Sequence, residues 1–399
     1  MLRCVAFLPD LPQRILSEIN AKLHSPETAA AVAGVESKLT NRRREQKVQS
    51  GAFRGMQVVV YRGIVVDDVA EVRVRVTEAP VLPGDSWIPY WDTVQVNLRR
   101  YAALDIMGAE VVLSIGKHTA TAVTDNHGFA DFALPVPNLR VGWHDAHAVV
   151  MPIGNGESAT GTGRVIKPSL KAPFMVVSDI DDTILVTGLT EGIAMVTRTV
   201  MRDANQRTAV PGMSSLYRGL ARGVANRAGN HGPEPSFFYV STGSWSFYTL
   251  LQQFVQLRAF PHGPMYLTDW GPTERQIRRS GAEHKRSTIR RLLEAYPDMP
   301  FVLIGDSGQR DPLTYEEVAR EFPDRVKLIM IRQVGSDGDD RNRKVRERAE
   351  NAREEGIPLH LTADASHAAE LAHSLGLCDE ETLVEVHTEL GRGSRAPAQ

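Results

Sequence analysis

Short apolar runs that stop at polar residues are the main pattern in the second half of the chain. The run at 174–177 leads through Ser178 to Asp179 and Asp181. Such a run predicts a strand buried on both faces, which is typical of a parallel sheet, and open α/β sheets bind ligands at the carboxyl ends of their strands. Because alternate residues of an extended segment point the same way, we expect both carboxylates to face one small polar volume. Acidic pairs also close strands and cap helices for structural reasons.

The same pattern recurs at 237–240, where the run leads to Ser241 and then Thr242 and Gly243. An apolar-periodic segment starts at Trp245, so the order is strand, tight turn and helix start. A hydroxyl and free backbone N–H groups at such a turn bind phosphate oxygens well. The alternative is a serine that only caps the following helix.

Two further polar segments complete the pattern. Lys285 lies in a segment that opens an amphipathic helix at Gly281, and the run at 301–304 leads to Asp306 and Asp311. A lysine on such a helix is usually a solvated charge, but an ammonium here would neutralise a carboxylate and phosphoryl oxygens together. Carboxylates are ligands that Mg²⁺ prefers, so the aspartates predict a magnesium site.

These four motifs in this order resemble the signature of the haloacid dehalogenase-like superfamily. Within it, the chain is most similar to the actin-patch-type phosphatidate phosphatases of fungi and their bacterial relatives. The resemblance covers roughly residues 55 to 335, and Thr242 and Gly243 depart from the residues common in the fungal proteins. It rests on four segments of the sequence: 178–184, 239–245, 260–264 and 304–312.

The resemblance, together with the chemistry of these side chains, implies a role for each motif. Asp179 would be the nucleophile that forms an aspartyl-phosphate, and Asp181 would be the general acid and base. Ser241, Thr242, Gly243 and Lys285 would hold the phosphoryl oxygens. Mg²⁺ would be held by Asp179, the backbone carbonyl of Asp181, Asp306 and Asp311, the last directly or through water. Asp182 is expected to be structural.

The pattern of runs predicts four parts. Residues 1–54 read as a helical arm that packs on the protein, with contact to a membrane surface or partial mobility as the alternatives. Residues 55–168 carry short β-type runs and predict a small antiparallel β-sandwich, whose last part, from 156 to 168, reads as a connection. Residues 171–376 predict an α/β domain with a Rossmann-like doubly wound parallel sheet and a minimal cap. Residues 377–399 predict a partly disordered tail.

Composition narrows the functional class. The chain has 399 residues, 2 cysteines and a formal net charge of −2. Its length favours more than one domain, and two cysteines in the terminal regions do not make a disulfide framework. The charge gives no reason to expect nucleic acid. The chain has no run of about 18 apolar residues, which would be needed for a spanning helix. We therefore expect a cytoplasmic protein, with peripheral membrane association left open.

The resemblance implies a lipid phosphate such as phosphatidate as the substrate, and a minimal cap would admit a bulky one. Arginines from Arg275 to Arg291 could meet anionic headgroups, although the same pattern describes an ordinary solvated helix. Two other functions remain open from the sequence: a phosphatase for a soluble or macromolecular phosphomonoester, with the sandwich as substrate adaptor, and a non-catalytic binder of anionic lipid. The partner of the sandwich is not identified.

Overall fold

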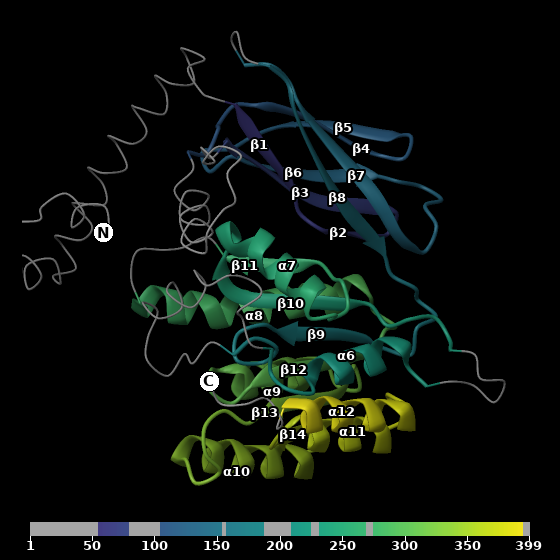
Figure 1. Ribbon diagram of the computed structural model, residues 1–399, viewed down its shortest axis with the longest axis vertical. Coiled ribbons are helices and arrows are strands. Elements are labelled where there is room, and N and C mark those ends of the chain that lie inside the picture. The colour runs from purple at the N-terminus through teal and green to yellow at the C-terminus, as the bar shows by residue number, and fades with distance from the viewer. Residues whose placement is uncertain are drawn as a thin grey trace, which may run out of the picture. The chain divides into compact units, whose positions relative to one another are not determined.

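A six-stranded parallel sheet lies in the part of the described chain that follows residue 174 (Figure 1). Its strands carry five residues of the predicted site: Asp179, Ser241, Thr242, Gly243 and Asp306. The computed structural model describes residues 55–79, 104–153, 157–186, 209–224, 231–268 and 274–393. The strand order is β11-β10-β9-β12-β13-β14, with parallel pairing throughout. The parallel sheet predicted from the apolar runs is therefore confirmed. Its strands are β9 (Met175–Asp179), β10 (Phe237–Ser244), β11 (Met265–Thr268), β12 (Phe301–Asp306), β13 (Val326–Arg332) and β14 (Leu359–Thr362).

Helices cover both faces of this sheet, and alternate strand residues divide between two cores. Val176 packs in one core with α6, α7, α11 and α12, whereas Met175 and Val177 pack in the other with α8, α9 and α10. Burial on both faces explains why the strands read as continuous apolar runs. The helices are α6 (Met213–Arg222), α7 (Tyr248–Leu257), α8 (Glu274–Ala295), α9 (Asp311–Glu321), α10 (Asp340–Glu354), α11 (Ala365–Ser374) and α12 (Glu380–Gly393).

The described residues between 56 and 167 form a second sheet, which has eight strands. Most of its strand pairs are antiparallel, but β2 pairs with β8 in parallel, so the sheet is mixed and not purely antiparallel as the sequence predicts. The predicted β-runs correspond to strands. They are β1 (Met56–Val60), β2 (Gly63–Val66), β3 (Val69–Glu78), β4 (Glu110–Ile115), β5 (His118–Val123), β6 (Phe129–Pro135) and β7 (Gly142–Val150), followed by β8 (Ala159–Lys167).

Strand β8 corrects the interpretation of residues 156–168 as a connection. Glycine and threonine alternate here, and glycine weakens a strand, so the sequence does not read as one. The glycines have a packing role. A Cβ at Gly161 would lie 2.6 Å from the carbonyl oxygen of Val58, and a Cβ at Gly163 would lie 2.6 Å from that of Val60. Glycine at these two positions lets β8 lie directly against the backbone of β1.

Two helices also differ from the sequence expectation. Helix α8 begins at Glu274, seven residues before the predicted start at Gly281. Residues 380–393, assigned to a tail from the sequence, form α12, in which Thr382 and Val386 are fully buried. Residues 1–54, most of the predicted cap region and residues 394–399 lie outside the described ranges. Among the described helices, none is long and apolar enough to cross a membrane.

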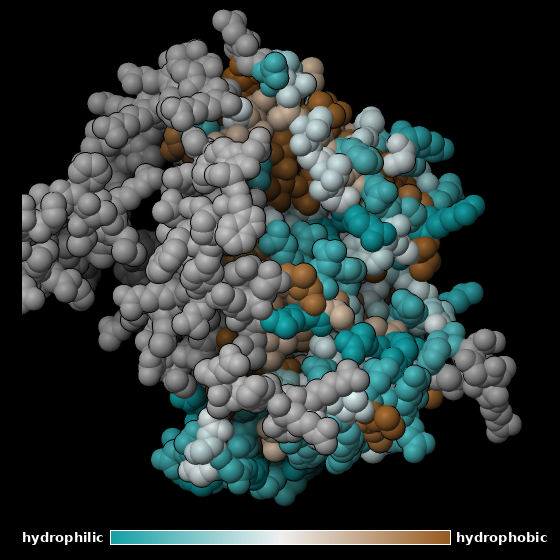
Figure 2. Space-filling model, in the orientation of Figure 1, coloured by the Kyte–Doolittle hydropathy of each residue, from teal (hydrophilic) through white to brown (hydrophobic). Residues whose placement is uncertain are grey.

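Residues 341–348, in which arginine and lysine are interspersed with polar and acidic residues, form part of α10. Figure 2 shows a surface over this helix that is almost entirely hydrophilic. Asn342 and Val345 are its buried positions here. The helix therefore has one narrow buried stripe and a broad solvated face.

The close approach of β8 to β1 predicts that Gly163→Val destabilises the protein by about 1–3 kcal/mol, because the new side chain would overlap the backbone of Val60. The neighbouring Thr162 is exposed, so Thr162→Val is the matched control, with an expected change within about 0.5 kcal/mol. Urea unfolding of the full chain measures both. Equal stability of the two variants would contradict the packing role of the glycine.

Candidate active site

Three neighbouring strands bring the predicted site residues to one edge of the parallel sheet. Strand β9 pairs with β10 through Asp179 and Val240, and with β12 through Ser178 and Ile304. The carboxyl ends of these strands therefore lie side by side. Asp179 is the last residue of β9 and Asp306 the last residue of β12. This edge is where open α/β sheets bind ligands.

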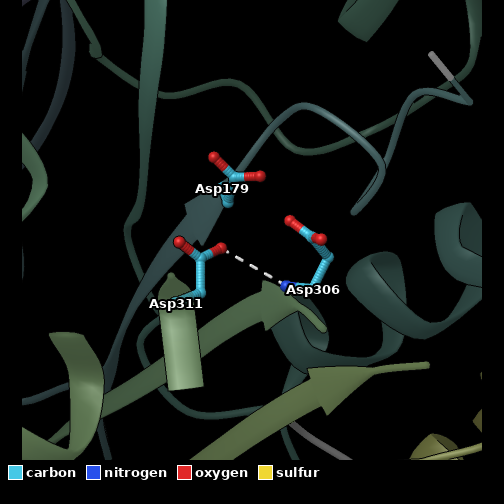
Figure 3. A group of neighbouring side chains, drawn as sticks. All are labelled: Asp179, Asp306 and Asp311. Carbon is cyan, nitrogen blue, oxygen red and sulfur yellow. Dashed lines mark hydrogen bonds between the residues drawn. The ribbon is translucent and has the colours of Figure 1, made fainter. Parts of the chain in front are cut away.

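Three aspartates form a buried cluster at this edge. Oxygen atoms of Asp179, Asp306 and Asp311 all lie within 4.8 Å of one another (Figure 3). Each side chain is at most 1% exposed. Asp311 begins helix α9, and its Oδ2 accepts a hydrogen bond of 3.3 Å from the backbone N–H of Asp306. Gly305 is required for this approach, since a Cβ there would lie 2.6 Å from Asp311 Oδ2.

Lys285 is buried inside the cluster and is not a solvated charge. Its Nζ lies 2.7 Å from Asp179 Oδ1 and 2.6 Å from Asp311 Oδ1. Burial by itself lowers the pKa of Lys285, but the charges of Asp179 and Asp311 outweigh this and raise the pKa above its usual value. The ammonium therefore stays charged and joins two motifs that are far apart in the sequence.

The charges of the cluster do not balance. Three carboxylates and one ammonium leave two negative charges in a buried volume, which is costly without a further cation or protons. Burial, and then the neighbouring Asp311, raise the pKa of Asp306 to about 8. Burial also raises the pKa of Asp179 well above its usual value, an effect that the Lys285 charge opposes.

The donor set fits a hard divalent cation. Asp306 Oδ1 accepts hydrogen bonds from the backbone N–H groups of Gly308 and Gln309, at 2.6 and 3.0 Å. Its Oδ2 is buried and has no hydrogen-bond partner in the described part of the chain. An anionic oxygen without a partner, beside other carboxylates, is a ligand atom suited to such an ion. One divalent cation would also neutralise the two excess charges.

Asp181 stands apart from the buried cluster. Its carboxylate Oδ2 accepts a 2.8 Å hydrogen bond from Ser241 Oγ, and the residue is half-buried. Its backbone carbonyl accepts a long contact of 3.4 Å from Gln309 Nε2. The two aspartates of the opening motif therefore have different partners, Lys285 for Asp179 and Ser241 for Asp181.

The segment after Ser241 differs from the predicted tight turn. Strand β10 continues to Ser244, with an irregular register between Val240 and Ser244, and a short 3₁₀ helix (Trp245–Phe247) follows. The N–H of Gly243 donates to Ser241 Oγ at 2.9 Å. Ser244 accepts from the N–H of Ser246, so it is the serine that caps the helix. Ser241 does not cap the helix, and its hydroxyl donates to Asp181 instead.

Two residues near the site, Thr183 and Arg332, were given no role from the sequence. Thr183 Oγ1 donates to Asp179 Oδ2 at 3.3 Å. Arg332, at the carboxyl end of β13, donates from Nε to the backbone carbonyl of Asp182 at 2.6 Å. Asp182 has a positive φ of 53°, so it is part of the turn after β9, in line with the expected structural role. The position of Arg332 after an apolar run is the signal that could have identified it.

The arginines that could have met anionic headgroups are largely paired where the structure describes them. Arg286 pairs with Glu283 and Glu317, and Arg290 pairs with Glu321. Arg291 pairs with Glu71 of the other sheet. These contacts favour the interpretation as an ordinary charged helix. The side chains of residues 275–279 lie outside the described set.

Comparisons with known proteins relate the parallel-sheet part to a family of catalytic domains. Residues 174–333 match the family model described as "Phosphatidate phosphatase APP1, catalytic domain". The chain is 34% identical over 158 residues to phosphatidate phosphatase APP1 of Saccharomyces cerevisiae, and 29% identical over 163 residues to an uncharacterized protein of Schizosaccharomyces pombe. These matches cover 39% and 41% of this chain, and 25% of each relative. The chain thus matches about a quarter of the length of these curated relatives.

Comparison with solved structures supports no conclusion about the fold or the function of this chain. A carbohydrate acetylesterase from Xanthomonas citri aligns at 11% identity with a TM-score of 0.24, covering 73% of this chain and 72% of that one. A TM-score this low shows neither fold nor function. The sequence matches are therefore what carries the relationship, and they confirm the predicted resemblance to phosphatidate phosphatases.

The raised pKa of Asp306 predicts a pH-dependent stability in the absence of divalent cations. The folded value of about 8 exceeds the usual value of about 3.9, so the folded protein holds a proton that unfolding releases. The stability from this proton is full below about pH 4 and is lost as the pH rises toward 8, by at most about 1.4 kcal/mol per pH unit. Urea unfolding between pH 5 and 8 in a chelator measures this slope.

The matched variant is Asp306→Asn, which removes the titrating group. We expect it to flatten the slope, and we expect added Mg²⁺ to flatten the slope of the unmodified protein. A slope that is the same in the variant and in the unmodified protein would contradict the assignment to Asp306.

Proposed function

We propose, from the relationship of residues 174–333 to phosphatidate phosphatase catalytic domains, that the protein is a Mg²⁺-dependent phosphatase with a haloacid dehalogenase-like fold. It hydrolyses a phosphate monoester, and the substrate proposed is a lipid phosphate such as phosphatidate. The observation that carries the proposal is the buried cluster of Asp179, Lys285, Asp306 and Asp311 at the carboxyl edge of the sheet. A non-catalytic lipid binder would have no need to bury these charges.

Mg²⁺ would be held by Asp179, Asp306 and the backbone carbonyl of Asp181, with Asp311 acting directly or through water. When bound, the ion neutralises charge on the phosphoryl group and aligns it. Asp311 already bonds Lys285 and the backbone of Asp306, so it supports the cluster even where it is not itself a ligand.

Asp179 is the proposed nucleophile. A carboxylate oxygen of Asp179 attacks phosphorus, and an aspartyl-phosphate bond forms as the bond to the leaving oxygen breaks. The attacking group must be ionised, although burial raises its pKa. The ammonium of Lys285, 2.7 Å away, favours the ionised form, and Thr183 holds the other oxygen.

Asp181 is the proposed proton carrier. As an acid, it transfers its proton to the leaving oxygen in the first step. As a base, it accepts a proton from the water that attacks phosphorus in the second step, which releases phosphate and restores Asp179. Its half-buried position and its bond to Ser241 suit a group that must meet both the leaving group and water.

Ser241, the amides of Thr242 and Gly243, and Lys285 are proposed to hold the phosphoryl oxygens. The Ser241 hydroxyl bonds Asp181 in this structure, so it would exchange that partner for a phosphoryl oxygen when substrate binds. The N–H of Gly243 would likewise leave Ser241. Both exchanges keep every donor bonded, which lowers their cost.

The substrate is tested by phosphate release from a panel of compounds in the presence of Mg²⁺. The panel contains phosphatidate in detergent micelles, lysophosphatidate, sugar phosphates and a phosphopeptide. We expect phosphatidate to give the highest kcat/KM, and Asp179→Asn to lower kcat by about 10⁴-fold or more, as for other nucleophile replacements. Turnover of a soluble ester but not of phosphatidate would contradict the lipid assignment. It would also remove the reason to propose that a cytoplasmic protein contacts the membrane surface.

The two-way role of Asp181 predicts different effects for good and poor leaving groups. An aryl phosphate needs no acid in the first step, so Asp181→Asn should still release one equivalent of nitrophenol from p-nitrophenyl phosphate in a rapid burst. The following steady state should be slower by about 10²–10⁴-fold, because the base for the second step is missing. Stopped-flow absorbance measures both phases. Loss of the burst together with the steady state would contradict the role of Asp181 in hydrolysis.

A further inference from the structure

Arg62 and Arg164 lie over one aromatic ring where the mixed sheet meets the parallel-sheet part, and His262 is near enough for both charges to lower its pKa. The two sheets belong to one compact unit. Arg62 lies in the connection between β1 and β2, and Arg164 lies on β8. His262 lies in the segment that enters β11 from its amino end, whereas the aspartates lie at the carboxyl ends of the strands. The proposed phosphatase chemistry uses none of the three.

Trp143 on β7 holds the two arginines together. The guanidinium carbon of Arg62 lies 5.8 Å from the centre of the Trp143 ring, and that of Arg164 lies 5.3 Å from it. Such contacts stabilise cations over an aromatic face but leave the N–H donors at the edge of each guanidinium available. Trp143 thus concentrates positive charge without neutralising it.

One nitrogen of the half-buried Arg62 side chain lacks the partner that a buried donor normally has. Its Nη1 is buried and makes no hydrogen bond within the described ranges, and no ion pair of Arg62 with a carboxylate occurs there. Arg222 and Arg286 also have a buried nitrogen without a hydrogen bond, but each is ion-paired with a carboxylate. A buried donor without a partner is costly, so such a group indicates a missing acceptor.

The surroundings of the cluster are short of negative charge. Burial lowers the pKa of Arg62, and the charged neighbour Arg164 lowers it further, while Tyr248 and Tyr239 act in the opposite sense and no carboxylate of the described residues does so. Partial burial, and then Arg62 and Arg164, lower the pKa of His262. Arg164 lies 3.6 Å from Asp145, whose side chain is 74% exposed.

We propose that Arg62, Arg164 and His262 form a second anion-binding site, which takes a phosphate group. A phosphate dianion offers several acceptor oxygens, and guanidinium groups match their geometry. Arg62 supplies the buried donor, and the exposed Arg164 and His262 form the rim through which the anion enters. The phosphate could be that of a soluble ester or of a lipid headgroup.

The local structure around Arg62 is held by its backbone and by the neighbouring Tyr61, and does not depend on the Arg62 side chain. The backbone N–H of Arg62 donates to Tyr248 Oη at 2.8 Å, and Tyr61 packs against Tyr248 and Trp245 with ring centres 4.5 and 4.7 Å apart. A change of the Arg62 side chain leaves these contacts in place. Arg62→Gln is therefore a suitable test of the binding site.

The test follows the imidazole NMR signal of His262 in the full chain with labelled histidine, assigned by comparison with His262→Gln. Inorganic phosphate is titrated against chloride at equal ionic strength. We expect a saturable shift with phosphate alone, an apparent affinity about tenfold weaker in Arg62→Gln, and a smaller loss in Arg62→Lys. The matched control is Arg343→Gln on the exposed face of α10, which should bind phosphate like the unmodified protein.

A second arm identifies the source of the phosphate. Vesicles of phosphatidylcholine, with and without phosphatidate, are floated with the unmodified protein and with Arg62→Gln. Weaker capture of the variant by phosphatidate vesicles indicates a lipid headgroup, and equal capture together with weaker binding of inorganic phosphate indicates a soluble ester. The proposal is overturned if the His262 signal does not respond, if chloride reproduces the shift, or if Arg62→Gln binds phosphate as tightly as the unmodified protein. None of these outcomes depends on phosphatase activity.

Discussion

The burial of Lys285 between Asp179 and Asp311 is the interaction on which the candidate active site depends. Three carboxylates cannot be buried together without compensating charge, and this ammonium is the fixed part of that compensation. It joins α8 to the end of β9 and to the start of α9. Removal of the lysine would leave the carboxylates unpaired in a volume from which water is excluded.

Glycines at two positions allow the elements around these ion pairs to approach one another closely. Gly305 lacks the side chain that would collide with Asp311, and Gly281 lets α8 approach β10, since a Cβ there would lie 2.7 Å from the Thr242 side chain. The strand ends of β9 and β12 then place Asp179 and Asp306 beside the lysine. The remaining excess of negative charge is what makes a divalent cation the natural complement of the cluster.

The sequence predicts the strands that are buried on both faces of the parallel sheet. The apolar runs before Asp179, Ser241 and Asp306 are strands of a parallel sheet, because strands covered on both faces need no polar positions. The alignment of their carboxyl ends then follows from parallel pairing. This is why residues more than one hundred positions apart could be expected at one edge.

The features that the sequence did not predict depend on contacts with distant segments. Glycine is unfavourable in a strand, and the reason for it in β8 is the close approach of the β1 backbone, which the sequence does not reveal. Lys285 is predicted as a site residue from the order of the motifs, but its local pattern is that of a solvated residue, and only the tertiary structure shows its burial between two carboxylates. The same holds for the partners of Arg332 and for the Nη1 atom of Arg62, which has no hydrogen-bond partner within the described ranges, since nothing near these residues in sequence indicates which groups surround them.

The proposed mechanism depends on covalent chemistry at Asp179, which a direct chemical trap can locate. The Asp181→Asn protein is mixed with substrate and Mg²⁺, quenched, and treated with borohydride, which reduces an aspartyl-phosphate to homoserine. Peptide mass spectrometry should then find homoserine at position 179 and unmodified aspartate at 306 and 311. Homoserine at another aspartate, or turnover without any trapped residue, would contradict the assignment of Asp179 as the nucleophile.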